Sequence, residues 1–439
     1  MTVKAQFFEL ADKLCGRLHA AETLLCTLSA ERSDFVRFNE GRVRQAGSVD
    51  QRFLSLRLVR AGRQASASIA LTGQPEDLQH AAATLNRVRE MLTQLPEDPW
   101  LLIADDPRST TSERHGVLPA VEAVVEQITS RPRPDLVGFY AGGAIYRAFA
   151  SSLGQRNWHE VDTFNLEWSL HLRGDKAVKD AYAGFEWDAP TFAARLQATT
   201  QRLELLGLPP RTLGPGEYRV YLAPRALEEV THVLNWDGYS ARARATRQSP
   251  LLRMELGEKL SPKVSITENT QEGVAPAFQQ DGFVKPQSVA LIAGGEIGHS
   301  LVSPRSAKEY GLEANAANSR ESPESLEMAA GNLAAEDALA ALDTGLYIGN
   351  LWYLNFSDRP AGRITGMTRF ATFWVEGGRI VAPVNAMRFD DTIYRMLGEN
   401  LLDLTREREL LLDASTYDER STASARLPGA LLKSLRFTL

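Results

Sequence analysis

Apolar residues follow two different spacings in the first part of the chain. Residues 7–21 and 75–95 carry apolar side chains every three or four positions, the interval of an amphipathic helix. Between them, residues 23–70 alternate apolar and polar positions, with turn-forming breaks around Gly41 and Gly62. Such alternation is typical of antiparallel strands with one buried face, joined by hairpins. The pattern therefore predicts a helix, a strand meander and a second helix.

The same two spacings continue up to residue 206. Residues 118–129 and 190–206 have helical periodicity, whereas residues 136–152 and 163–187 alternate like further antiparallel strands. The next stretch, GLPPRTLGP at 207–215, is rich in Pro and Gly, which is typical of a linker. We therefore predict two domains. Residues 1–206 form an α+β domain with an antiparallel sheet and helices, and residues 207–439 form the second.

The C-terminal half is dominated by short β-like segments. A strand at 217–222 leads into a helix that Pro224 begins. Later segments with strand character are 263–267, 288–292, 346–354, 370–375 and 379–384, the last two joined by a tight hairpin at Gly377-Gly378. The Arg- and Glu-rich residues 401–412 predict a helix, followed by a loose tail. Many strands with few helices favour a mostly β domain with a curled or barrel-like sheet.

Composition and charge exclude several classes of protein. The formal net charge is −6, and no run of Lys and Arg supplies the basic face that a nucleic-acid binder needs. The only cysteines, Cys15 and Cys26, cannot make a disulfide framework for 439 residues. The amphipathic start has no secretory h-region, and no stretch is apolar enough to span a membrane. We expect a cytoplasmic protein without nucleic-acid or membrane partners.

Three stretches of the sequence resemble one known family. They are RFNEGRVRQAGSVDQRFLSLRLVRAGR near the N-terminus, AFQQDGFVKPQSVALIAGGEIGHSLVSPRSAKEYG in the middle, and residues 345–400, which begin GLYIGNLWYLNF. Their order and spacing are similar to those of the TldD/PmbA family. The resemblance implies a metallopeptidase subunit of two domains that dimerises around a cleft, in which flexible or ribosomally made peptides are threaded and cut.

The zinc-bearing members of that family carry H-E-x-x-x-H on a helix after the domain boundary, with a cysteine further on. Here the matching helix has Leu227 in place of the first histidine, followed by Glu228 and His232. No cysteine occurs after Cys26; the loop 358–363 is the natural place for the later cysteine, and Gly362 in that loop cannot bind a metal. A catalytic zinc needs three protein ligands. The resemblance therefore implies a non-catalytic, TldE-like chain without its own metal, whose TldD-like partner subunit carries the zinc.

Two other functions remain open. The chain could be a stand-alone metallopeptidase with an atypical zinc site of His232, His299 and a carboxylate, or a non-enzymatic peptide-binding modulator. His232 and Glu228 are also four residues apart on a helix and could form an ordinary exposed pair. The sequence G-G-E-I-G-H, which places Glu296 near His299, is read as a turn.

A second group of polar residues follows the strand at 346–354. Asp358, Arg359, Arg363 and Arg369 lie in and near one polar loop. Three guanidinium groups together could bind the carboxylate of a peptide, and they could equally form ion pairs at a subunit interface. The two interpretations assign the same residues to peptide binding or to partner binding, and the chain could form homodimers when its partner is missing.

Overall fold

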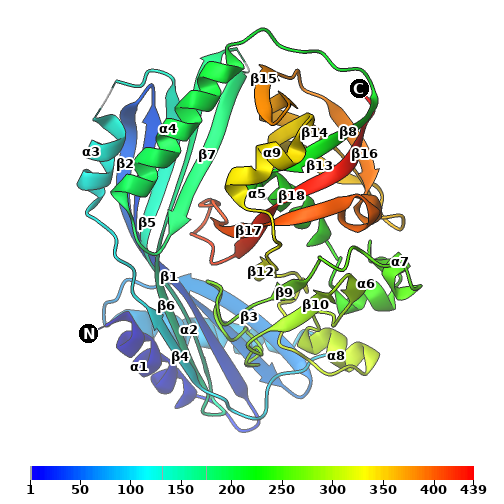
Figure 1. Ribbon diagram of the computed structural model, residues 1–439. Helices are drawn as coiled ribbons and strands as arrows, with labels where there is room; N and C mark the ends of the chain where they lie inside the picture. The colour runs from blue at the N-terminus through cyan, green and yellow to red at the C-terminus, as the bar shows by residue number, and fades with distance from the viewer. Residues whose placement is uncertain (1, 131, 175) are drawn as a thin grey trace.

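The computed structural model describes residues 2–130, 132–174 and 176–439. Two β-sheets, each with its own helices, make up the molecule (Figure 1). The first sheet is formed by the N-terminal part of the chain and the second by the part after residue 215. Within the described residues no helix is long and apolar enough to cross a membrane.

The N-terminal sheet contains unusually long antiparallel strands. Its order is β3-β2-β1-β5-β6-β4, with β7 also paired to β6, and only β4 runs parallel to its neighbour. The strands are β1 Thr23–Asn39, β2 Arg42–Arg60, β3 Arg63–Ala70, β4 Thr110–Arg114, β5 Leu136–Ser151, β6 Arg156–Arg173 and β7 Lys176–Gly184. The hairpins predicted around Gly41 and Gly62 are confirmed, and both glycines have the positive φ that such turns favour.

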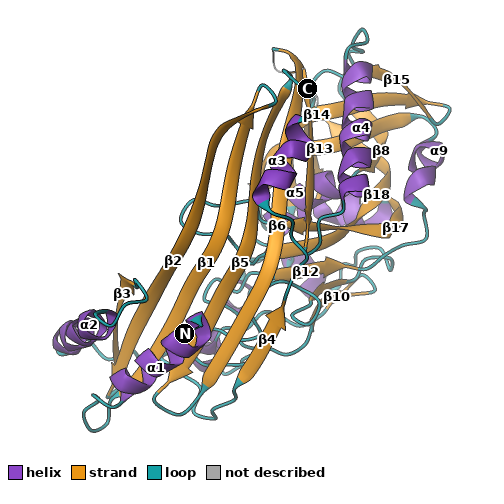
Figure 2. Cartoon of the chain, turned by 90° about the vertical axis from the view of Figure 1, so that its left-hand side faces the viewer, coloured by secondary structure: helices purple, strands orange, loops and turns teal. Residues whose placement is uncertain are grey.

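Four helices cover this sheet. They are α1 Val3–Cys15, α2 Asp77–Leu92, α3 Val121–Thr129 and α4 Ala189–Leu206. α1 and α2 pack on one end of the long strands, where Leu54, Leu56 and Leu58 of β2 are fully buried. α3 and α4 lie toward the other end (Figure 2), where Phe373 of the second sheet joins their apolar cluster. The two sheets therefore share buried contacts.

The second sheet closes on itself. Its order is β11-β10-β9-β12-β18-β16-β14-β13-β8, and β18 pairs again with β8, so that β18, β16, β14, β13 and β8 form a ring. The strands are β8 Gly216–Leu222, β9 Ile266–Glu268, β10 Val289–Ala293, β11 Glu296–Ile297, β12 Ser325–Met328, β13 Gly345–Asp358, β14 Arg363–Glu376, β15 Arg379–Pro383, β16 Arg388–Thr392, β17 Leu401–Leu412 and β18 Ser424–Phe437. The predicted α+β class and curled C-terminal sheet are confirmed.

The helices of the C-terminal part are short. They are α5 Pro224–Leu234, α6 Ala241–Ala245, α7 Leu252–Glu255, α8 Pro304–Tyr310 and α9 Ala338–Leu342, with a 3-10 turn at Ala335–Asp337 and a π turn at Arg395–Glu399. α5 packs against β13 and β18 and contributes the centre of the largest apolar core. The linker predicted at 207–215 joins α4 to β8, and the division into two domains there remains a prediction.

Two expectations for the C-terminal end were wrong. The predicted helix at 401–412 is the strand β17, because its buried leucines pair with β18 along one edge. The predicted loose tail is β18 itself, which pairs with β8, β12, β16 and β17. The segment between α2 and α3, for which the sequence pattern predicts no element, includes the short strand β4.

Candidate functional site

Helix α5, which corresponds to the family's metal-binding helix, is strongly amphipathic. Ala223 is extended and Pro224 occupies the first turn, where its missing N–H costs nothing, so the chain turns directly from β8 into α5. One side of α5 is fully buried, through Ala226, Leu227, Val230, Thr231, Val233 and Leu234. The opposite side carries Glu228, Glu229 and His232. This division fixes which residues can reach solvent.

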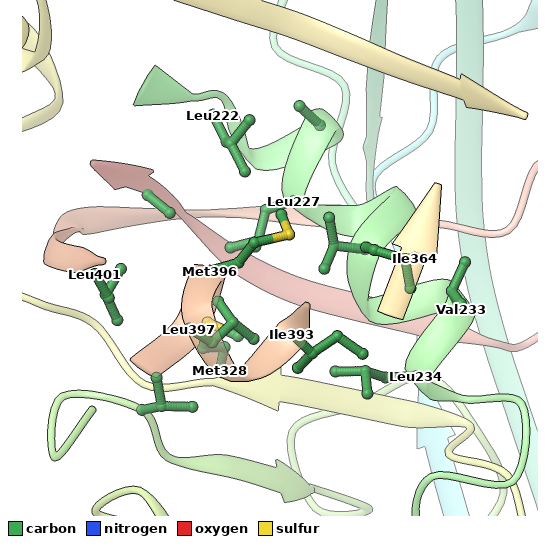
Figure 3. Packing of buried hydrophobic residues seen from close by; sticks show 14 of the residues in the cluster. Leu222, Leu227, Val233, Leu234, Met328, Ile364, Ile393, Met396, Leu397 and Leu401 are labelled. Carbon is green, nitrogen blue, oxygen red and sulfur yellow. The ribbon is translucent and has the colours of Figure 1, made fainter. Parts of the chain in front are cut away.

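Leu227 belongs to the buried side. Its side chain is 0% exposed and lies in the core beside Met396 (Figure 3). A helix turns about 100° per residue, so a position five residues away lies about 140° around the axis. His232 is accordingly exposed on the other side of α5. Leu227, which stands in place of the first histidine, therefore lies in the apolar core, whereas His232 faces solvent.

Glu228, Glu229 and His232 line a groove of about 670 Å³ between the two sheets. The N-terminal sheet contributes Glu167 of β6 and Lys179 of β7. The other walls come from the C-terminal part of the chain, namely Arg225, Thr231, Asn235, Trp236, Asp237, Arg242, Arg320, Ser322, Pro323, Leu326, Leu411, Leu412, Asp413, Ala414 and Ala423–Ala425. The groove is thus built from α5, the segment before β12 and the ends of β17 and β18.

A network of charges lies where α5 meets strands β6 and β7 of the N-terminal sheet. Arg225 lies 3.3 Å from Glu167 and 3.7 Å from Glu228, and Lys179 lies 3.4 Å from Glu167. Burial raises the pKa of Glu228 from 4.5 to about 7, although the charge of Arg225 opposes the shift. A carboxyl with a pKa of about 7 gains or loses its proton near neutral pH. The net charge of this part of the groove therefore depends on pH in that range.

Glu229, His232 and Trp236 continue along the exposed side of α5. Burial raises the pKa of Glu229 above its ordinary value, and the neighbouring His232 opposes that shift. The His232 ring meets Trp236 edge-to-face, with 5.8 Å between ring centroids. The closest charged partner of Glu228 is Arg225, so Glu228 and His232 share the groove without forming the simple ion pair that their spacing suggested.

These side chains do not fit a catalytic zinc. Such a site needs three protein ligands and an open position. Leu227 carries no donor atom and faces the core, and no described cysteine follows Cys26. Within residues 2–130, 132–174 and 176–439, no three His, Cys, Asp or Glu side chains are grouped so that they could hold a metal ion.

The polar residues after β13 have separate partners. Asp358 accepts a hydrogen bond from the backbone N–H of Ala361 in the loop. Arg359 forms an ion pair of 2.7 Å with Asp237, a residue that lines the groove. Arg359 therefore reaches the rim of the groove from the β13–β14 loop.

The other two arginines of this group lie along β14. Arg363 lies 3.2 Å from Asp390 of β16, and the Arg369 guanidinium stacks over the Trp352 ring at 4.7 Å. Neither contacts a residue that lines the groove in these pairings. The structure thus places Arg359 alone of the three beside the groove.

The segment G-G-E-I-G-H contains the Gly294-Gly295 turn between β10 and β11 and the short strand β11 itself. Gly294 and Gly295 both have positive φ, and Glu296 pairs with Lys259 at 2.5 Å. His299 follows β11 and is exposed. Neither side chain lines the groove that contains His232.

Several groove residues were missed from the sequence. Alternation along residues 165–171 placed Glu167 on the polar face of its strand, but nothing local indicated that it meets Arg225. Arg242, in the short helix α6, and Arg320, in the segment before β12, carry no motif. Loop 413–423 was missed because the flanking strands β17 and β18 were predicted as a helix and a loose tail.

The fold and groove define a two-sheet α+β protein in which a helix from the C-terminal part lines an inter-sheet groove. Residues 215–439 match the family described as PmbA/TldA metallopeptidase C-terminal domain. The chain belongs to this PmbA/TldD metallopeptidase family. A search of curated proteins finds no match.

Solved structures share the whole fold at low sequence identity. TldE from Thermococcus kodakarensis has a TM-score of 0.80 and 13% identity over 98% of this chain and 100% of its own. A candidate modulator of a DNA gyrase from Thermotoga maritima has a TM-score of 0.77 and 15% identity, over 98% and 100%. A candidate modulator of DNA gyrase from Bacteroides thetaiotaomicron has a TM-score of 0.76 and 14% identity, over 99% and 98%.

Proposed function

We propose that this chain is a non-catalytic, TldE-like subunit of a TldD/TldE zinc metallopeptidase that cleaves flexible or ribosomally made peptides. The observation that carries the proposal is the position of Leu227. It stands where the family's zinc helix has its first histidine, and its side chain is buried in an apolar core. The TldD-like partner supplies the zinc and the chemistry, in the cytoplasm.

The groove along α5 provides a surface for an extended peptide. It combines apolar walls, such as Trp236, Leu411 and Leu412, with acidic and basic side chains. Apolar walls with a few placed polar groups are typical of ligand sites. In this proposal the groove guides the substrate toward the partner subunit, and Arg359 holds its rim through Asp237.

A mixing experiment tests the proposal. The purified chain, a partner with an intact H-E-x-x-x-H helix and their mixture are each assayed on casein and on a short unstructured peptide. We expect the mixture to cleave faster than the partner alone, and the chain alone to be inactive. Equal activity of the partner with and without this chain would contradict the subunit role.

The same assay separates the alternatives. Zinc-dependent cleavage by the chain alone would support a stand-alone metallopeptidase with a site at His232. Peptide binding with no effect on a partner's cleavage would support a non-enzymatic modulator. Size-exclusion chromatography of the mixture and of the chain alone distinguishes the expected heterodimer from a homodimer.

A further inference from the structure

Two arginines line the groove outside the ion pairs of the Glu228 network. Arg242 of α6 and Arg320, in the segment before β12, both line the groove and are exposed. The groove's other cations near α5 are paired, as in the Arg225–Glu167 contact of 3.3 Å. Within the described residues, neither Arg242 nor Arg320 has a carboxylate within the 4.0 Å of an ion pair. Both guanidinium groups are therefore available to a ligand.

A buried carboxylate holds the two arginine-bearing segments together. Glu321 is 1% exposed and accepts a hydrogen bond of 2.8 Å from the backbone N–H of Arg242. It also accepts bonds from the Ser240 hydroxyl at 2.5 Å and from the N–H and hydroxyl of Ser303 at 2.8 Å. Since Arg320 directly precedes Glu321, this carboxylate positions both arginines at one place while its own charge faces the interior.

Acidic and basic side chains come from different segments of the groove lining. Glu228 and Glu229 lie midway along α5, whereas Arg242 and Arg320 follow it in the chain, in α6 and in the segment before β12. A helix rises about 1.5 Å per residue, so the stretch from Glu228 to the end of α5 at Leu234 covers about 9 Å. An extended chain covers about 3.3 Å per residue, so the groove spans about three peptide residues.

We propose that Arg242 and Arg320 form a subsite for the C-terminal carboxylate of a peptide, which sets the direction in which the peptide lies in the groove. The inference rests on the proposed peptide-binding function of the groove. Guanidinium groups bind carboxylates through paired, charge-assisted hydrogen bonds. The peptide's C-terminus lies at the arginines, and its upstream residues extend toward Glu228 and Glu229.

A binding experiment with matched peptides tests this subsite. An uncharged pentapeptide with a fluorescent label at its N-terminus is prepared with a free C-terminal carboxylate, with a C-terminal amide, and as an amide with one internal Asp. Binding to the purified full-length chain is followed by fluorescence anisotropy. We expect the free carboxylate to bind about tenfold more tightly than either amide, which is the gain that two solvent-exposed ion pairs would give.

The variant R242Q/R320Q should lose the preference for the free carboxylate. It should bind all three peptides with the affinity that the wild-type chain has for the amide. The matched control is R44Q/R379Q, which removes two exposed arginines that do not line the groove and should retain the preference. Circular dichroism checks that both variants are folded, and the comparison of peptides on the wild-type chain needs no variant.

The outcomes separate the inference from the function on which it rests. If no peptide binds, the proposed peptide-binding groove is wrong. If free acid and amide bind the wild-type chain equally, peptide binding stands and the carboxylate subsite is overturned. If the internal Asp peptide binds as tightly as the free acid, the arginines bind any carboxylate without preference. The assignment of the subsite to the C-terminal carboxylate is then overturned.

Discussion

One guanidinium nitrogen of Arg420 donates hydrogen bonds to both the backbone carbonyl of Thr163, at 2.8 Å, and its hydroxyl, at 2.7 Å. Arg420 lies in loop 413–423 between β17 and β18, whereas Thr163 lies on β6. Its other terminal nitrogen bonds to the carbonyl of Gly143 at 3.0 Å. Arg420 is only 4% exposed, so the loop attaches the second sheet to the first at a buried point.

We expect Arg420→Ala to lower the free energy of unfolding by about 2–4 kcal/mol, because buried acceptors lose charge-assisted hydrogen bonds. The matched control is Tyr417→Ala in the same loop, whose side chain is 96% exposed, and it should have little effect. Urea unfolding measures both. Equal stability of the two variants would show that the loop does not join the sheets.

Leu227→His tests the separation between the core and the groove. We expect a loss of about 2–4 kcal/mol in unfolding free energy, because an imidazole replaces a leucine that is 0% exposed in an apolar core. Leu227→Met keeps the volume and should cost less than about 1.5 kcal/mol. Thermal unfolding with and without added zinc measures both changes. Stabilisation of the histidine variant by zinc would mean that position 227 can reach the groove.

Glu228 should make stability depend on pH. Its pKa is raised in the folded state, so the folded protein binds this proton more tightly than the unfolded chain. The resulting stabilisation is fully present below pH 4.5 and is lost as pH rises through about 7. Above that pH the ionised, partly buried carboxylate lowers stability relative to a neutral group of the same shape.

We therefore expect Glu228→Gln to be more stable than the wild-type chain by about 2 kcal/mol at pH 8, with the difference vanishing near pH 4.5. Glu76→Gln, an exposed position, serves as the control and should show no such trend. Unfolding in urea at a series of pH values measures the difference. A constant difference across pH would contradict the assignment.

Arg359 should affect substrate binding more than folding. Arg359 and Asp237 are each 34% exposed, and such surface ion pairs contribute at most about 1 kcal/mol. We expect Arg359→Gln to change unfolding free energy by less than that and to raise the KM of the mixed complex about threefold. Arg369→Gln, whose partner is the Trp352 ring, is the control. Equal KM values for both variants would favour a structural role for the Arg359 contact.

Local sequence pattern predicted the elements whose partners are near in the chain. The β1–β2–β3 meander, the helices α1 to α5 and the Gly377-Gly378 hairpin depend on periodicity and turn residues, and each was recognised, whereas the short helices α6 to α9 were not. The segment 401–412 was misread because LLDLTRERELLL has alternating Arg and Glu with good helix propensity. Pairing with β18, which local sequence does not encode, overrides that propensity.

β18 was missed for a related reason. Pro428 and Gly429 normally interrupt a strand, so the segment read as a tail. In the fold, Gly429 is favoured because a Cβ there would overlap the hydroxyl end of the Tyr221 side chain. The groove residues contributed by loops, such as Arg320 and Asp413, depend on how the two sheets come together, and a single sequence gives no signal for that.

Zinc content of the purified chain, measured by elemental analysis, tests the central claim most directly. The account predicts far less than one zinc per chain, the same content in His232→Ala, and peptide cleavage only after the zinc-bearing partner is added. About one tightly bound zinc per chain that is lost in His232→Ala, together with cleavage by the chain alone, would contradict it.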